Sequence, residues 1–189
     1  MGAMNLANRI TIARIILIPF FIAAIVYSKM NIALALFILA IISDGVDGFI
    51  ARALKQKTQL GTILDPVADK LLLLSAYICL SVANTIPVHL KMPPYVPIIV
   101  ISRDVIIVLG SVMVHIIKGD LKVSPSIAGK VTTFFQMITI VSVLIGFKYS
   151  FILWNSAIVL TVISGVDYIV KGSKLLGENH NNTILKKAG

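Results

Sequence analysis

Long apolar runs separated by short polar segments make up most of the 189-residue chain. The runs cover about residues 10–27, 31–54, 61–83, 96–117, 126–147 and 151–174. Each is close to the roughly 20 mostly apolar residues that an α-helix needs to cross a bilayer. The segments between them are basic or contain Pro, as expected of loops. The pattern predicts an all-α, polytopic membrane protein with six transmembrane helices.

One membrane domain, residues 4–176, accounts for all six runs, and residues 177–189 form a polar C-terminal tail. Residues 1–3 precede a second Met and resemble an expression scar. The first run contains Arg14 and Pro19 and has no small-residue cleavage site before Lys29. We therefore interpret it as an uncleaved span rather than a signal peptide. Arg14 is expected to extend along the helix to the membrane interface.

The composition agrees with a membrane protein, because 58% of the residues are hydrophobic and only 13% are charged. A typical soluble domain has about 25% charged residues. The net charge of +9 would suit nucleic acid, but the basic residues lie at the ends of the apolar runs and no nucleic-acid module is present. We expect anionic membrane lipids, and no nucleic acid, as partners. Cys79 is the sole cysteine, so there is neither a disulfide framework nor a thiolate metal site.

The distribution of Lys and Arg predicts the orientation in the membrane. With the amino terminus inside, the cytoplasmic side carries Arg9, Arg14, Arg52, Lys55, Lys57, Lys118, Lys122, Lys130, Lys171 and Lys174. The opposite loops carry Lys29, Lys91 and Lys148. Basic residues are enriched in cytoplasmic loops. The sequence therefore predicts a multi-pass protein of the inner or plasma membrane with both termini in the cytoplasm.

Four aspartates stand at helical spacing on either side of the loop between the second and third runs. Asp44 and Asp47 are three residues apart, and Asp65 and Asp69 are four residues apart, so each pair shares a helix face. The short loop makes the two helices antiparallel neighbours, which places both acidic faces in the cytoplasmic half. The cytoplasmic ends of the first, fifth and sixth runs are also polar. We expect a polar, cytoplasm-facing cavity that holds the active site.

These four carboxylates could not all ionise unaided in a poorly solvated region, because a charged aspartate at a helix centre costs about 2.5–3.5 kcal/mol. Divalent cations with oxygen ligands remove this difficulty, and Mg²⁺ or Mn²⁺ suits hard carboxylates. Two opposed acidic faces favour a site for two ions. A proton relay, or ion pairs with Arg52 or Lys70, are alternatives that the sequence leaves open.

Small residues and an arginine accompany the aspartates. Gly48 and Ala51 share the helix face of the first acidic pair, and Gly61 shares that of the second. Small side chains let a ligand approach the backbone closely, although they also serve helix packing. Arg52 can bind a phosphate with a bidentate fork. Together these residues favour a metal-bridged pyrophosphate pocket.

Written out, the segment is Asp44-x2-Asp47-Gly48-x2-Ala51-Arg52-x8-Gly61-x3-Asp65-x3-Asp69. It resembles the signature of the CDP-alcohol phosphotransferase family at every fixed position. The resemblance implies that a substituted phosphate moves from a CDP-linked donor to an alcohol, with release of CMP. It implies two Mg²⁺ or Mn²⁺ ions on Asp44, Asp47, Asp65 and Asp69, and Asp69 as general base. It also implies CDP binding by Gly48, Ala51, Arg52 and Gly61, and a homodimer.

Other segments resemble the phosphatidylglycerophosphate synthases within this family. They are Asn8-x2-Thr11-x2-Arg14 and the Gly-Lys-Val-Thr-Thr-Phe-Phe-Gln segment at residues 129–136. This resemblance implies CDP-diacylglycerol as the donor and glycerol 3-phosphate as the acceptor. Arg103-Asp104 resembles their Arg-Glu pair with a shorter acid. The Arg-Asp form is also similar to eukaryotic-type cardiolipin synthases, whose acceptor is phosphatidylglycerol, and this alternative stays open.

A phosphorylated acceptor needs cations near the metal ions but away from the pyrophosphate. Arg103, Lys130 and Lys171 are candidates, together with Arg14. Pairing of Arg103 with a nearby aspartate (Asp104 or Asp167), and interfacial anchoring by the two lysines, are alternatives. Two other classes of protein use intramembrane aspartates. A prenyltransferase is disfavoured because its motifs lack the Gly-x2-Ala-Arg register, and a transporter would need no nucleotide.

Overall fold

The computed structural model describes residues 6–53, 59–118 and 127–187, with side chains for residues 11–45, 68–110, 127–171 and 173. The described residues contain helices and turns and no strand, which confirms the all-α prediction. They form α1 (Leu6–Val26), α2 (Met30–Ala53), α3 (Gln59–Val82), α4 (Tyr95–Lys118), α5 (Ile127–Ile145) and α6 (Ser150–Lys187). Each corresponds to one apolar run of the sequence.

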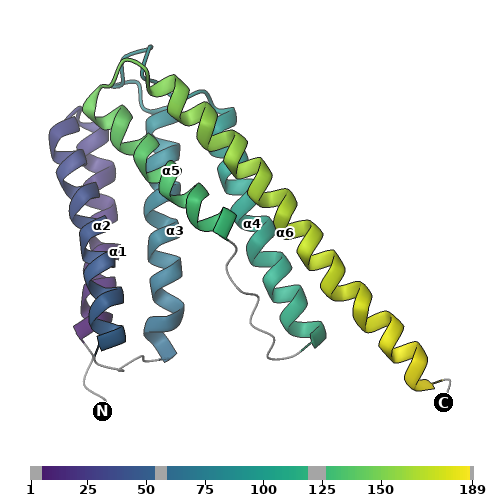
Figure 1. The fold of residues 1–189 in the computed structure, drawn as a ribbon. Helices are drawn as coiled ribbons and strands as arrows, with labels where there is room; N and C mark the ends of the chain where they lie inside the picture. The colour runs from purple at the N-terminus through teal and green to yellow at the C-terminus, as the bar shows by residue number, and fades with distance from the viewer. Residues whose placement is uncertain (1–5, 54–58, 119–126, 188–189) are drawn as a thin grey trace.

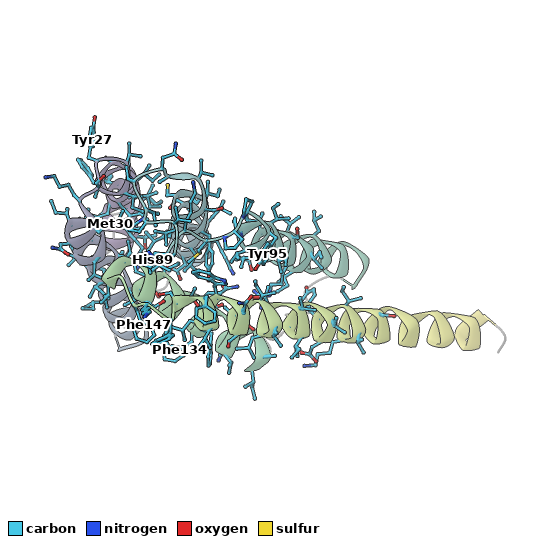
Figure 2. The ribbon with its side chains drawn as sticks, turned by 90° about the horizontal axis from the view of Figure 1, so that it is seen from above. Tyr27, Met30, His89, Tyr95, Phe134 and Phe147 are labelled. Carbon is cyan, nitrogen blue, oxygen red and sulfur yellow. The ribbon has the colours of Figure 1, made fainter. Side chains whose placement is uncertain are left out.

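Successive helices alternate in direction, so both ends of the described chain lie at the lower side of Figure 1, although they are far from each other. The starts of α1 and α3 and the ends of α2, α4 and α6 all lie at the lower end of Figure 1. The α1, α2 and α3 helices stand side by side, whereas α6 packs on α4 and α5. Seen from above, the later part of α6 projects away from the other helices (Figure 2). The sequence motif at residues 44–69 spans the end of α2 and the start of α3, so it lies toward the lower end of the bundle.

The last helix is longer than the sequence predicted. The apolar run ends near Lys174, but α6 continues to Lys187. The segment from 175 to 187 has no Pro, and an α-helix satisfies its backbone hydrogen bonds internally without a tertiary partner. The first part of the predicted polar tail is thus helical.

Two tight turns at the upper end join neighbouring helices. Ser28 has φ of 60° between α1 and α2, and Gly146 has φ of 80° after α5. The Gly146 N–H donates to the Val143 carbonyl at 3.0 Å, and the Phe147 N–H donates to the Ser142 carbonyl at 2.9 Å. This arrangement is a Schellman cap, in which glycine takes the left-handed position. Short turns of this kind hold α5 and α6 antiparallel.

Polar and aromatic side chains join the helices across the core. The rings of Phe21 in α1 and Phe37 in α2 have centroids 5.7 Å apart. The Tyr77 hydroxyl in α3 donates to the Gln136 carbonyl in α5 at 3.2 Å. Gln136 Nε2 in turn donates to Thr161 Oγ1 in α6 at 3.1 Å. These contacts join α1 to α2, and they join α3 to α5 and α5 to α6.

Large apolar side chains also cover the outside of the bundle. Phe20, Ile98, Leu109 and Phe134 are each 60–63% exposed. Tyr27, at the upper rim, points away from the helices (Figure 2). Within the described residues, Ile127–Ile145 and Ser150–Lys171 are helical segments long and apolar enough to cross a membrane, and Thr11–Val26 and Met30–Gly45 are shorter apolar helices. Large exposed apolar surfaces mark protein or membrane contact.

Candidate active site

The two halves of the aspartate motif meet at one arginine. Arg14 Nη1 in α1 donates to Asp69 Oδ1 in α3 at 2.6 Å. The same nitrogen lies 2.9 Å from Asp44 Oδ1 in α2. Because one atom contacts both carboxylates, their Oδ1 atoms can be no further apart than these two distances combined. Three helices thus converge on two carboxylates and one guanidinium.

The position of Arg14 differs from the sequence prediction. Its side chain is 1% exposed and does not extend to the interface. Arg14 shares a helix face with Thr11, Ile18 and Phe21, all of which are buried. A buried guanidinium is costly unless acidic groups pair with it. The carboxylates supplied by α2 and α3 provide that compensation, a tertiary relationship that the first apolar run alone could not reveal.

The carboxylates are open on one side and closed on the other. Asp44 is 39% exposed and Asp69 is 33% exposed. Toward the core they border a small cavity of about 10 Å³, enough for about one water molecule. Its other lining residues are Phe37, Ala40, Ile41, Leu72, Leu73 and Met137. An apolar floor beneath two half-exposed carboxylates allows a ligand to approach only from the other side.

The remaining motif residues lie outside the described side chains. They are Asp47, Gly48, Ala51, Arg52, Gly61 and Asp65. Their backbone belongs to α2 and α3, so the predicted spacings fall on continuous helix. Asp44 comes from one acidic pair and Asp69 from the other, and their meeting at Arg14 agrees with two opposed acidic faces.

The described part of the site fits a hard divalent cation by its donor chemistry. Two carboxylates from separate helices present oxygen atoms, the ligands that Mg²⁺ and Mn²⁺ prefer. Within the described side chains, no three His, Cys, Asp or Glu residues gather in one place. Arg14 supplies a positive charge to both described carboxylates. Asp44 and Asp69 are therefore ion-paired with Arg14, whereas Arg52 and Lys70 were the partners considered from the sequence.

A second polar cluster joins α3, α4 and α6. Lys70 Nζ donates to Asp104 Oδ2 at 2.6 Å, and Arg103 Nη1 donates to Asp104 Oδ1 at 2.8 Å. Arg103 Nη2 also donates to Ser164 Oγ at 2.7 Å. We call Lys70, Arg103 and Asp104 the basic cluster. Of the two aspartates considered as partners of Arg103, the structure selects Asp104.

The other two predicted acceptor-side cations are exposed. Lys130 lies on the exposed face of α5. Lys171 is 60% exposed and donates to Asp167 Oδ2 at 2.7 Å within α6. The described contacts do not bring either lysine to Asp44 or Asp69. Arg14 is therefore the predicted acceptor-side residue that touches the aspartates, and Arg103 lies in the basic cluster.

A sequence profile described as CDP-alcohol phosphatidyltransferase matches residues 4–163. The chain belongs to the CDP-alcohol phosphatidyltransferase family. It is 31% identical over 181 residues to a CDP-diacylglycerol–glycerol-3-phosphate 3-phosphatidyltransferase of Aquifex aeolicus, covering 92% of this chain and 98% of that one. It is 32% identical over 195 residues to the protein of the same name in Bacillus subtilis, covering 91% and 97%. A human cardiolipin synthase (CMP-forming) is 30% identical over 193 residues, covering 90% and 62%.

The family match confirms the resemblance inferred from the motif at residues 44–69. It also extends well beyond the motif, since it begins at residue 4 and ends at residue 163, within the first half of α6. The CDP-alcohol phosphatidyltransferase fold of this chain thus includes α1, which supplies Arg14 to the two described motif aspartates. Arg14 belongs to the same structural unit as the signature although it precedes the signature by 30 positions.

Sequence reasoning missed two partners in this family member. Ser164 contacts the buried Arg103, and Lys70 joins α3 to α4 rather than pairing with a motif aspartate. The sequence contains a signal for Ser164, because Ser164 and Asp167 are three residues apart in the sixth run and so share one polar helix face. For Lys70 the signal is weaker, since adjacent helical residues point about 100° apart and Lys70 cannot share the face of Asp69.

Proposed function

We propose that this chain transfers the phosphatidyl group of CDP-diacylglycerol to glycerol 3-phosphate, which gives phosphatidylglycerophosphate and CMP. The observation that carries the proposal is the meeting of Asp44 and Asp69 at Arg14 in a member of the CDP-alcohol phosphatidyltransferase family. Relatives that the chain matches almost end to end are named for this reaction. The chain is therefore proposed to be an enzyme of phospholipid synthesis.

In the proposed site, Asp44, Asp47, Asp65 and Asp69 hold two Mg²⁺ or Mn²⁺ ions. When bound, these ions neutralise the donor pyrophosphate and stabilise the departing CMP. Gly48, Ala51, Arg52 and Gly61 bind the CDP part of the donor. This assignment rests on the sequence signature, and it is supported by the convergence of one aspartate from each pair.

Asp69 is the proposed general base. Its carboxylate takes the proton of the acceptor hydroxyl as that oxygen bonds to the phosphorus carrying the diacylglycerol. The bond from the same phosphorus to the CMP oxygen breaks, and CMP leaves with the electron pair. The Arg14 guanidinium, 2.6 Å from Asp69 Oδ1, orients the carboxylate. A base must lie within about 3 Å of the group it deprotonates. Asp69 is 33% exposed, so an acceptor hydroxyl can approach its carboxylate.

The acceptor phosphate needs positive charge outside the donor site. Arg103, Lys130 and Lys171, together with Arg14, are the proposed acceptor-side residues. Arg103 is buried among α4 and α6, whereas the two lysines are exposed to a soluble substrate, and Lys171 is paired with Asp167. Glycerol 3-phosphate carries about two negative charges near neutral pH. Cationic hydrogen-bond donors therefore favour it over an uncharged alcohol as the acceptor.

All six helices are proposed to span an inner or plasma membrane, with both termini and a polar cavity on the cytoplasmic side. The alternating directions of the helices support this topology, because they bring the starts and ends described above to one end (Figure 1). The exposed apolar side chains on the outer faces would contact lipid. A homodimer, implied by the family resemblance, completes the proposal.

The reaction class is tested by the leaving group. Purified protein in phosphatidylcholine vesicles with CDP-diacylglycerol and Mg²⁺ should release CMP only when glycerol 3-phosphate is added. In a parallel assay with an isoprenyl diphosphate in place of CDP-diacylglycerol, release of inorganic pyrophosphate would indicate a prenyltransferase instead. Ion or solute flux without nucleotide turnover would indicate a transporter. Either outcome would contradict the proposal.

Cardiolipin synthesis from phosphatidylglycerol is the second candidate. Human and rat cardiolipin synthases are 30% and 31% identical to this chain, but the chain covers only 62% of each. The Arg103-Asp104 pair, which is also similar to that subgroup, is intact and bonded at 2.8 Å. The two candidates differ in the acceptor alone, so a parallel assay with phosphatidylglycerol in place of glycerol 3-phosphate separates them.

A further inference from the structure

The basic cluster contains two cations and one carboxylate. Asp104 uses a different oxygen for each partner, Oδ2 for Lys70 at 2.6 Å and Oδ1 for Arg103 at 2.8 Å. Both oxygens are therefore engaged, and the three groups together carry one net positive charge. A positive charge is expensive in a membrane interior, and charged groups kept there usually serve substrates or partners.

The two cations retain donors that could bind an anion. Arg103 is 7% exposed and its Nε has no hydrogen-bond partner among the described residues. The Lys70 ammonium carries three N–H groups, and one contacts Asp104. Lys70 is 39% exposed, so its ammonium can be reached from outside the bundle. The cluster thus combines a buried, fixed cation with an accessible one.

The place of the cluster relates it to the proposed base. Lys70 follows Asp69 directly, and consecutive α-carbons are about 3.8 Å apart. Their side chains point about 100° apart on the helix, so Lys70 faces α4 while Asp69 faces α1 and α2. The cluster therefore lies beside the proposed metal site but outside it. A group bound there would not compete with the donor pyrophosphate.

We propose that Lys70 binds the phosphate of the acceptor and that Asp104 is a positioning residue that holds Lys70 and Arg103 for this purpose. The inference rests on the proposed function, because it takes the acceptor to be a phosphomonoester. A dianionic phosphate would offset the excess positive charge and accept hydrogen bonds from Lys70. Its glycerol hydroxyl would then lie near Asp69, the preceding residue of α3.

A purely structural role makes a different prediction. The Lys70–Asp104 pair also ties α3 to α4, and the Arg103–Ser164 bond ties α4 to α6. Loss of a structural tie would lower thermal stability and would impair the use of donor and acceptor alike. Loss of an acceptor contact would impair the acceptor alone. The Michaelis constants of the two substrates therefore distinguish these roles.

The test uses the full chain in phosphatidylcholine vesicles, with KM measured for glycerol 3-phosphate and for CDP-diacylglycerol. Lys70→Gln should raise KM for glycerol 3-phosphate by about tenfold, the effect of losing one hydrogen bond from a charged donor. KM for CDP-diacylglycerol should stay unchanged. Lys70→Arg, which retains the charge, should restore most of the acceptor KM. Asp104→Asn should raise the same constant without affecting the donor.

Lys91→Gln is the matched control. Lys91 is an exposed lysine that donates to Asn84 Oδ1 at 3.2 Å, in the connection between α3 and α4. It should leave both constants unchanged. Asp104→Asn leaves Arg103 buried without its carboxylate. If this variant does not fold, the Lys70 variants still test the inference, because Lys70 is 39% exposed. An unchanged acceptor KM in Lys70→Gln, or equal changes for both substrates, overturns the inference.

The same assay keeps the two proposals apart. Wild-type turnover with glycerol 3-phosphate supports the proposed function whatever Lys70→Gln does. Wild-type protein that releases CMP only with phosphatidylglycerol contradicts the proposed acceptor and, with it, a phosphomonoester site at Lys70. Normal wild-type turnover with no acceptor effect in the Lys70 variant contradicts this inference alone.

Discussion

Arg14 Nη1 lies 2.6 Å from Asp69 Oδ1, so a side chain of α1 is bonded directly to the proposed base in α3. The same nitrogen also contacts Asp44 of α2. The aspartate site therefore contains a fixed positive charge of its own. This charge lets two part-exposed carboxylates lie close together. We expect it to be partly redundant when divalent ions bind there.

Replacing Arg14 should make the fold depend on metal. In Arg14→Gln, Asp44 and Asp69 lose their shared cation and repel each other. Without metal, the free energy of unfolding of the variant should be about 1–3 kcal/mol below that of the wild type. The loss is smaller than for a fully buried pair, because both carboxylates are part-exposed. The variant should therefore melt several degrees below the wild type in detergent. Saturating Mg²⁺ should reduce this difference, because the ions supply the missing positive charge.

Lys29→Gln provides the control, since Lys29 is an exposed lysine in the turn after α1. It should melt like the wild type with and without Mg²⁺. If Mg²⁺ raises the melting temperatures of Arg14→Gln and wild-type protein equally, Arg14 and the metal ions do not share the same carboxylates.

Asp69→Asn should abolish turnover while the fold persists. The amide has nearly the same shape as the carboxylate but cannot take a proton from the acceptor hydroxyl. Removal of a general base typically lowers the rate by about 10²–10⁴-fold. Initial rates of CMP release, with a melting curve as the folding check, measure this effect. Near wild-type rates would remove Asp69 from the role of base.

Much of the fold followed from the sequence because the helices are long and mostly apolar. The ranges expected from hydropathy agree with α1 to α5 to within a few residues. The end of α6 did not follow, because no Pro marks a stop and the hydropathy of the chain falls well before the helix ends at Lys187. Hydropathy indicates where a helix is apolar and says little about where a polar helix ends.

For the candidate site, the sequence predicted the positions of the aspartates but not those of their basic neighbours. Asp44 and Asp69 could be brought together from spacing and a short loop, because both lie in neighbouring antiparallel helices. Arg14 could not be placed, since a single Arg in an apolar run is compatible with snorkelling or with burial. Which one occurs depends on carboxylates 30 and 55 positions away in the chain. The pairing of Lys70 with Asp104 likewise depends on how α3 and α4 pack.

Arg103→Ala and Lys130→Ala should both raise KM for glycerol 3-phosphate but should differ in stability. Arg103 is buried and bonded to Asp104 and Ser164, so its loss leaves buried polar groups without partners. That change should cost about 1–3 kcal/mol. Lys130 is exposed, so its variant should melt like the wild type. Unchanged acceptor KM in both variants would show that the acceptor binds elsewhere.

Gly110 should be required for the packing of α4 on α6. A Cβ atom at this position would lie 2.8 Å from Tyr168 Cε1. The Tyr168 ring would have to move, and overpacking of this kind costs about 1–3 kcal/mol. Gly45→Ala is the matched control, because a Cβ there meets nothing within 4 Å. Melting curves should show Gly110→Ala destabilised and Gly45→Ala unchanged or slightly stabilised; the reverse order would contradict this packing.

The acceptor is the central question, and a direct competition answers it. Vesicles that contain CDP-diacylglycerol and phosphatidylglycerol are incubated with the protein, Mg²⁺ and isotopically labelled glycerol 3-phosphate, and the lipid products are identified by mass spectrometry. We predict labelled phosphatidylglycerophosphate, with one CMP released for each molecule formed. Unlabelled cardiolipin as the sole new lipid would contradict the proposed function.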